Sequence, residues 1–587
     1  MSKPTGTAGT DSLERPLPAD VQTAQFGSDV VADALRAVGI EYIALNPGAS
    51  YRGLHDSLVN YLGNTQPQML VCLHEESAVA IAHGYAKAGG KMMAAAVHSN
   101  IGLMHASMAI FNAWCDRLPI MIIGATGPVD AARRRPWIDW IHTARDQGAL
   151  VRDYTKWDDQ PASPEAAREA VLRGSWLANT APCGPVYINL DAQMQEAKLA
   201  DAVPPIDASR FTPKVASAPA GDLVDAALAA LTSARRPLIL AGRASRDVHA
   251  WQRRVALAER LGAGVLTDLK VGAAFPTDHP AHLGAQGLIA PGMSWVEAVR
   301  DADVILSLDW VDLDGTLRIA TGGPAPTARI IHASVDYQIH RGWSMDHLGL
   351  PAIDVFLPVE PDTVVTALLS ALEGRSPAEN AKLTEERSLQ TTAEPTPSGP
   401  IRVRVLAGAL RRALRDRAAT LARVPLTWDV GVWPFRHPLD YLGFNGGGGL
   451  AAGPGIAVGA ALALKGSDRM CVAFCGDGDY LMGVTALWTA VRYRIPLLVV
   501  VYNNRGYFDD EMHQDRVARA RGRPVQNRWI GQTLTDPDID IAGMARAQGA
   551  RGFGPVLDGG QLEQVLIEAV AAVEAGEVVV VDVVTVS

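Results

Sequence analysis

The chain alternates short apolar runs with segments of helical spacing along most of its length. Near the start, "YIALNPG", "KMMAAAVHS" and "PIMIIGA" have the pattern of buried strands, while "SAVAIAHGYAKAGG" and "GLMHASMAIFNAWCD" have helical spacing. Strands that are apolar almost throughout are typical of parallel sheets, because helices cover both faces of such sheets. The pattern therefore predicts an α/β protein with doubly wound parallel sheets.

Two linker-like stretches divide this pattern into three units. One is Pro- and Ala-rich and covers 202–222; the other is polar, with Thr and Pro, and covers 376–400. A chain of 587 residues is long enough for several domains, each with its own core. The predicted parts are a disordered N-terminal segment (1–22) and three α/β domains (23–195, 219–375 and 401–587).

The first and third units share a weak similarity. "AIAHGYAKAGGKMMAAAV" and "GIAVGAALALKGSDRMCVAF" each combine a helix of small residues, a turn with Lys and Gly, and an apolar strand. This arrangement is compatible with an internal duplication and equally with the general construction of α/β proteins.

Composition and charge narrow the function classes. A net charge of −10 does not favour a nucleic-acid partner. The short basic cluster at 132–136 is interpreted as a solvated surface, with a site-lining role as the alternative. No apolar run has the length of a membrane-spanning helix, so no membrane association is predicted. The five cysteines lack paired metal-ligand spacing, which predicts reduced thiols and a cytoplasmic protein.

Candidate chemistry gathers in one βαβ unit of the third domain. "RMCVAF" and "PLLVVVYNN" are predicted parallel strands, followed at their carboxyl ends by "GDGD" and "NNRGY". Ligands of open α/β sheets bind at this edge, so both motifs should face one crevice. Asp477, Asn504 and the carbonyl of Gly506 can supply the oxygen ligands that Mg²⁺ prefers. Gly476 and Gly478 would let the backbone approach a diphosphate.

These two motifs, at this separation, resemble the thiamine-diphosphate motif of the acetolactate synthase and 2-keto acid decarboxylase family. The resemblance extends from about Gln25 to the end of the chain. It implies pyrimidine-binding, central and pyrophosphate-binding domains, with thiamine diphosphate and Mg²⁺ as cofactors. It also implies that each site lies between two chains, so that the protein is at least a homodimer and is expected to be a homotetramer.

The resemblance also implies a catalytic glutamate in "LHEESAVAIAHGYAKAGGK". The spacing to Gly84 identifies it as Glu75 rather than Glu76. In the family, this carboxyl group contacts the cofactor pyrimidine and promotes formation of the internal base that takes the proton from thiazolium C2. A dipole-stabilising residue at a helix start is the alternative interpretation.

Further cofactor contacts follow from the same resemblance. In "FNGGGGLAAGPG", Leu450 corresponds to the apolar wedge under the bent cofactor, and the Gly448 carbonyl would accept from its amino group. "TWDVGVW" resembles the segment near the pyrophosphate and includes Asp429 and Gly431. Asp479 stands where the family commonly has serine. An acid beside phosphates is unfavourable unless it turns outward or meets a cation.

The segment "AVHSNIGLMHA" resembles benzoylformate decarboxylase, which also places His-Ser at this point. His98 is therefore the candidate proton shuttle, with a structural histidine as the alternative. His105, further along the helix, is expected to serve packing. The candidate substrate contacts are Ser50, Arg52 and, as either a second site histidine or a loop residue, His279.

The resemblance implies a C–C lyase or carboligase that acts on 2-keto acids or diketones. Acetolactate-synthase-like ligation is the first expectation, and benzoylformate-decarboxylase-like release of an aldehyde is the alternative. FAD, which some relatives carry in the central domain, is not predicted, because "LAGRAS" and "SLDWVDLDGTL" give only a weak signal. A non-catalytic protein is disfavoured by intact Glu75, Asp477 and Asn504. A nicotinamide enzyme is disfavoured because no convincing glycine fingerprint is present.

Overall fold

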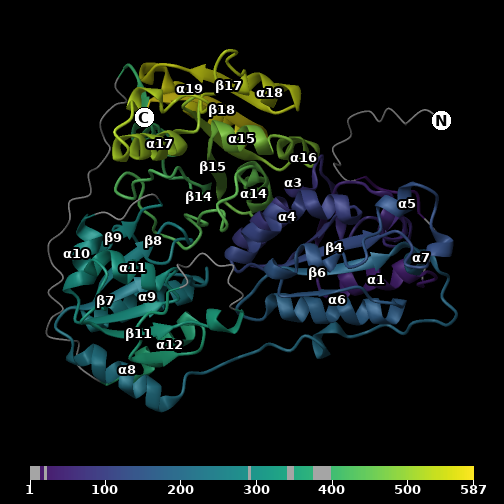
Figure 1. Cartoon of the computed structure of the whole chain (residues 1–587), viewed down its shortest axis with the longest axis horizontal. Coiled ribbons are helices and arrows are strands. Elements are labelled where there is room, and N and C mark those ends of the chain that lie inside the picture. The colour runs from purple at the N-terminus through teal and green to yellow at the C-terminus, as the bar shows by residue number, and fades with distance from the viewer. Residues whose placement is uncertain (1–13, 19–22, 289–292, 340–348, 375–397, 587) are drawn as a thin grey trace.

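The computed structural model describes residues 14–18, 23–288, 293–339, 349–374 and 398–586. Figure 1 shows three α/β domains: the N-terminal in purple and blue, the central in teal, and the C-terminal in green and yellow. Each is built on a six-stranded sheet whose paired strands are parallel, which confirms the predicted fold class. Most of the segment predicted to be disordered and most of the second predicted linker lie outside the described residues.

The N-terminal sheet is covered on both faces. Its apolar strand residues alternate, so that Ile122 joins the core beneath α3 and α4 while Ile123 joins the core beneath α1 and α6. The strands, in spatial order, are β2 (Gln68–Val71), β1 (Tyr42–Leu45), β3 (Met93–Ala96), β4 (Ile120–Thr126), β6 (Val186–Asp191) and β5 (Trp157–Asp159). The helices that bear on the argument are α1 (Gly27–Ala37), α3 (Glu75–Gly89), α4 (Ser99–Cys115) and α6 (Pro164–Asn179).

The central domain has the same construction. Its helices begin and end with strong local signals: at α9, Asp247 accepts from the N–H of Ala250, and left-handed Gly262 follows the last turn. The strands, in spatial order, are β12 (Val355–Leu357), β11 (Arg329–Ala333), β10 (Val304–Leu308), β7 (Pro237–Ala241), β8 (Gly264–Asp268) and β9 (His282–Gln286). The helices are α8 (Gly221–Ser233), α9 (Val248–Leu261), α10 (Met293–Asp301), α11 (Leu313–Thr321) and α12 (Pro361–Ala371).

The C-terminal domain carries the predicted βαβ unit. The helix that follows the first strand of this unit starts within the "GDGD" motif itself, because Asp477 and Asp479 belong to its first turn. The strands, in spatial order, are β13 (Ile401–Arg402), β18 (Val578–Val586), β16 (Leu497–Asn503), β15 (Met470–Gly476) and β14 (Ala419–Arg423), with β17 (Arg551–Val556) also paired to β18. The helices are α13 (Val403–Leu414), α14 (Ala452–Ala463), α15 (Asp477–Gly483), α16 (Ala486–Arg492), α17 (Phe508–Ala520), α18 (Ile541–Ala547) and α19 (Gly559–Glu574).

Helices α3 and α14 pack against each other where the N- and C-terminal domains meet, and their backbones are in contact. A Cβ added to Gly84 would lie 2.0 Å from the carbonyl oxygen of Ile456, and one added to Gly459 would lie 1.9 Å from that of Ile81. Only glycine allows this approach, which explains the small residues that both helices share. One continuous apolar core therefore runs from the first domain into the third and fixes their relative position.

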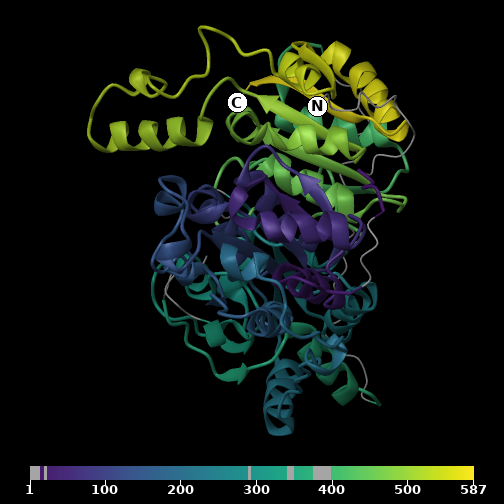
Figure 2. The ribbon, with the colours of Figure 1, turned by 90° about the vertical axis from the view of Figure 1, so that its right-hand side faces the viewer.

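Helix α17 is the exception to this packing. Figure 2 shows it standing away from the body of the chain together with the loop that follows it. Of its residues, Ala518 is the one that is buried. Among the described residues, no helix is long and apolar enough to cross a membrane.

Candidate active site

The structure brings the two polar motifs together at the carboxyl edge of the C-terminal sheet. Asp477 follows β15, and Asn504 follows the neighbouring strand β16. Asp477 is buried; its Oδ2 accepts from the N–H of Gly506 at 3.0 Å and its Oδ1 from the N–H of Gly478 at 2.9 Å. Burial raises the pKa of Asp477, an effect that these hydrogen bonds oppose and a cation would also oppose.

The side chain of Asn504 completes a group of converging polar atoms. One of its amide atoms lies 2.8 Å from the Gly506 carbonyl oxygen and 3.3 Å from Oδ1 of Asp477. As nitrogen, this atom would donate to both; as oxygen, it would make three oxygens converge, which requires a cation. Adjacent ligands of an Mg²⁺ octahedron lie about 2.9 Å apart. The donor set and spacing therefore fit Mg²⁺.

The first asparagine of the motif has a different role. Nδ2 of Asn503 donates to Asp582 at 3.0 Å, and its Oδ1 accepts from the N–H of Arg505 at 3.1 Å. Arg505 is left-handed, with φ of 59°, so this pair of bonds holds the turn that presents Gly506. Burial raises the pKa of Asp582 to about 6, and the charge of Asp477 adds to the rise. Sequence reasoning missed Asp582, although an acid among the valines of "VVVVDVVTV" is the available signal.

Asp479 meets a cation. Its Oδ2 lies 2.6 Å from Nε of Arg423, the last residue of β14, and its Oδ1 accepts from the N–H of Gly453 at 3.3 Å. Both side chains of the pair are buried, at 3% exposure for Asp479 and 7% for Arg423. The N–H of Nε is not aligned with the oxygen, so the contact is an ion pair, and Nη1 of Arg423 has no hydrogen-bond partner in the described chain. Burial and the charge of Asp479 raise the pKa of Glu76 to about 6.

The glycine-rich loop lies on α4 of the N-terminal domain. Gly448 has φ of 73°, and the N–H of Gly449 donates to Oδ1 of Asn112 at 3.3 Å. A Cβ on Gly446 would lie 2.1 Å from the carbonyl oxygen of Asn112. Leu450 is 40% exposed, which leaves its side chain available as the predicted wedge.

Asp429 and Gly431 are held by contacts within the C-terminal domain. Oδ1 of Asp429 accepts from the N–H of Gly431 at 2.8 Å, and Oδ2 accepts from Arg404 of α13 at 2.5 Å. Gly431 is exposed. These contacts do not by themselves indicate a diphosphate ligand, and the role of both residues stays a prediction.

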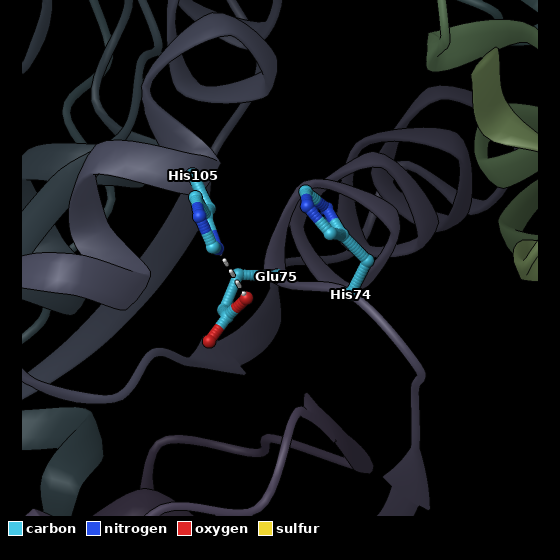
Figure 3. A group of neighbouring side chains, drawn as sticks. All are labelled: His74, Glu75 and His105. Carbon is cyan, nitrogen blue, oxygen red and sulfur yellow. Dashed lines mark hydrogen bonds and ion pairs between the residues drawn. The ribbon is translucent and has the colours of Figure 1, made fainter.

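Glu75 begins α3 and is buried, and Figure 3 shows its side chain beside those of His74 and His105. His105 of α4 lies 3.2 Å from its carboxylate, from Nδ1 to Oε2, and the rings of His74 and His105 stack at 4.9 Å. His105 packs on His74 as expected, and its side chain, which is 57% exposed, also contacts Glu75. The three side chains offer ligand atoms within 4.8 Å of one another. The ligands of a tetrahedral Zn²⁺ ion lie about 3.3 Å apart, so this arrangement does not match a zinc site. Moreover, Nδ1 of His74 already accepts from the N–H of Glu76.

His98 follows β3 and forms the N-cap of α4. Its Nδ1 lies 2.9 Å from Oγ of Ser50, which brings two predicted site residues together. Arg52, the predicted carboxylate contact, pairs instead with Glu196 at 2.6 Å. Burial lowers the pKa of His98, so the imidazole favours its neutral form.

His279 lies in the central domain with other partners. Its Nε2 is 3.2 Å from Glu259, its Nδ1 accepts from the N–H of Ala281, and its ring packs edge-on against Phe275. These contacts match the loop-residue alternative. In the same domain, a cavity of about 560 Å³ adjoins the segments considered for FAD, and it is lined by Arg243 and several acids. Arg243 lies 3.6 Å from Asp309 and 3.5 Å from Asp336, a charge arrangement that disfavours a diphosphate.

Three family models match the chain in the order of its domains. They are the N-terminal TPP binding domain of thiamine pyrophosphate enzymes (residues 26–150), the central domain (224–341) and the C-terminal TPP binding domain (427–583). These matches agree with the fold and with the group of Asp477, Asn504 and Gly506 at the C-terminal sheet edge. The chain belongs to the thiamine pyrophosphate enzyme family.

Within this class, the chain is similar to both synthases and decarboxylases. It is 25% identical over 501 residues to a probable acetolactate synthase large subunit of Methanocaldococcus jannaschii (82% of this chain, 80% of the relative). It is also 25% identical over 502 residues to benzoylformate decarboxylase of Pseudomonas aeruginosa (82% and 85%). The benzoylformate decarboxylase structure from Polynucleobacter necessarius has the same fold, with a TM-score of 0.77 and 22% identity over 96% of this chain and 99% of that one.

Proposed function

We propose that the protein is a thiamine-diphosphate- and Mg²⁺-dependent lyase that decarboxylates a 2-keto acid and releases an aldehyde. The observation that carries the choice of product is the partly buried His98–Ser50 pair at the end of β3, since a neutral imidazole can exchange the proton that aldehyde formation requires. Ligation to a second carbonyl, as in the acetolactate synthases among the relatives, is the second candidate.

The residues of the chain divide the work. Asp477, Asn504 and the Gly506 carbonyl would hold Mg²⁺ and through it the diphosphate, while Leu450 would support the bent cofactor. The bound cofactor supplies a nucleophilic carbon that adds to the keto group and accepts the electrons left when CO₂ departs. Glu75, enclosed by α3 and α4, would hold a proton at the cofactor pyrimidine. His98 would hold and deliver the proton at the reacting carbon.

We further propose that two chains build each site. Apolar side chains are exposed near both halves: Leu73 at 47% and Met104 at 54% beside Glu75, and Leu450 at 40% in the glycine-rich loop. A partner chain would cover these surfaces and bring Glu75 of one chain to the proposed Mg²⁺ ligands around Asp477 of the other. A homodimer is then the minimum, and a homotetramer the expected assembly.

The decisive experiment supplies the protein with Mg²⁺, thiamine diphosphate and a panel of 2-keto acids and diketones, with products identified by NMR. An aldehyde as the main product supports the lyase; an acyloin or acetohydroxy acid supports the carboligase. Glu75→Gln should abolish turnover while cofactor binding persists, and Glu75→Gln mixed with Asp477→Ala should recover activity if sites are shared. A wild-type protein that binds the cofactor yet converts no compound of the panel would refute the proposal.

A further inference from the structure

The segment between β4 and the short helical turn at 148–150 is fixed against the start of α4. The carbonyl oxygen of His142 accepts from Oγ of Ser99 at 2.6 Å and from the N–H of Gly127 at 3.3 Å. The carbonyl oxygen of Ile141 accepts from Nδ2 of Asn100 at 3.1 Å. Both anchors belong to the first turn of α4, directly after His98, so the same turn positions His98 and this segment.

This anchoring involves backbone strain. Ser99 has φ of 55° and is fully buried, and Trp137 within the segment has φ of 66°. Left-handed backbone costs a residue with a side chain about 1–2 kcal/mol. Strain of this kind persists where the surroundings hold it in place, and it clusters at functional sites. The strained turn at Ser99 places the imidazole of His98 against that of His142.

The rings of His98 and His142 meet edge to face, with centroids 4.8 Å apart and an interplanar angle of 89°. On its other side, His98 is enclosed by Ser50 and by Gly48, where an added Cβ would lie 2.4 Å from the ring. Nδ1 of His98 is engaged with Ser50, which leaves Nε2 for other contacts. The imidazole of His98 therefore has one fixed orientation.

Three neighbouring ionisable side chains act on the pKa of His98. Burial is the largest cause of its lowered pKa; His142 and Arg135 lower the pKa further, and Glu75 opposes them. A proton on His142 disfavours a proton on His98, because the two imidazoles are in contact.

We propose that His142 is a second imidazole in the supply of the proton that His98 delivers, and that it exchanges protons with His98. This inference rests on the proposed function, because it assigns the source of the proton used there. His98 gives a proton to the reacting carbon, half-buried His142 takes a proton from solvent, and His142 then passes this proton to the neutral His98. His142 acts through His98 and is a positioning residue that need not touch the substrate.

The proposal replaces the role that sequence resemblance suggested for His279. That histidine contacts Glu259 and Phe275 in the central domain, whereas His142 contacts His98 directly. Two hypotheses for the second imidazole are therefore distinct and can be compared by substitution.

The test compares His142→Gln, His142→Ala and His279→Gln with the control His249→Gln, at an exposed position on α9. In the full-length holoenzyme, we expect His142→Gln to lower kcat for keto-acid turnover about 100-fold, as for loss of general acid–base help, with KM within about twofold. In a plot of kcat against pH, His142→Gln should lack the fall that wild type shows on one side of the optimum. Imidazole added to His142→Ala should restore turnover, which a purely structural residue would not allow.

A second measurement does not depend on turnover. In cofactor-free protein labelled at histidine, NMR should show the pKa of His98 rising in His142→Gln, because His142 contributes to lowering it. Unchanged His98 titration, or unchanged kcat and pH profile in His142→Gln, would overturn the proposal, as would loss of that fall in kcat in His279→Gln alone. If wild-type protein converts no keto acid, the proposed function fails, and the NMR comparison still decides whether the two histidines are coupled.

Discussion

The buried pair of Asp479 and Arg423 allows a quantitative test of the site. The perturbation is Asp479→Ser, which introduces the residue common in the family. It leaves Arg423 almost fully buried without the carboxylate of Asp479, while the ring of Phe444 stays 4.7 Å from the guanidinium carbon. Removing one partner of a buried ion pair costs about 3–5 kcal/mol, and the cation–π contact does not reduce this cost because wild type already has it. We therefore expect a loss of about 3–5 kcal/mol in the free energy of unfolding.

The assay is urea unfolding of the cofactor-free chain, read from the transition of the C-terminal domain. The control is the double variant Arg423→Met with Asp479→Ser, which removes both charges and should lie within about 1 kcal/mol of wild type. Adding Mg²⁺ and thiamine diphosphate should stabilise Asp479→Ser more than wild type, because a diphosphate can supply the missing negative charge. An Asp479→Ser chain as stable as wild type without cofactor would refute the reasoning.

Three further predictions concern packing, pH and the metal. Gly459→Ala, which forces a Cβ against the Ile81 carbonyl, should cost about 1–3 kcal/mol in urea unfolding, whereas Gly221→Ala, with open space around it, should be neutral. Asp582→Asn should raise stability at pH 7. The pKa of Asp582 is raised to about 6, so the carboxylate destabilises the fold above that pH, and this cost disappears as the pH falls toward 4; an unchanged pH dependence of unfolding would contradict the assignment. Asp477→Ala should abolish Mn²⁺ binding measured by electron paramagnetic resonance, and retained stoichiometric binding would exclude this group of residues as the metal site.

The fold could be predicted because its signals are local. Apolar strands and helices of small residues specify parallel sheets regardless of what lies beside them. Asp477 and Asn504 could also be placed, since the carboxyl ends of parallel neighbours meet at one edge. Arg423, His142 and the contact of His105 with Glu75 could not, because each depends on which residues from distant segments lie beside it. Nothing within "RRRPWIDWIHTARD" indicates that its histidine reaches His98.

Within one chain, the position of Asp479 links the glutamate half of one proposed site to the metal-binding half of the other. Its charge acts on Glu76, which follows Glu75 on the first turn of α3, while its carboxylate receives the N–H of Gly453 at the start of α14. Because the backbones of α3 and α14 are in contact, the start of α3 and the start of α14 cannot shift independently. The acid that replaces serine therefore sits where the C-terminal motif and the glutamate helix share one electrostatic environment. Exchanging it should alter the titration of Glu76 even where the metal ligands stay intact. A Glu76 pKa that does not fall in Asp479→Ser, measured by NMR, would show that burial alone causes the rise.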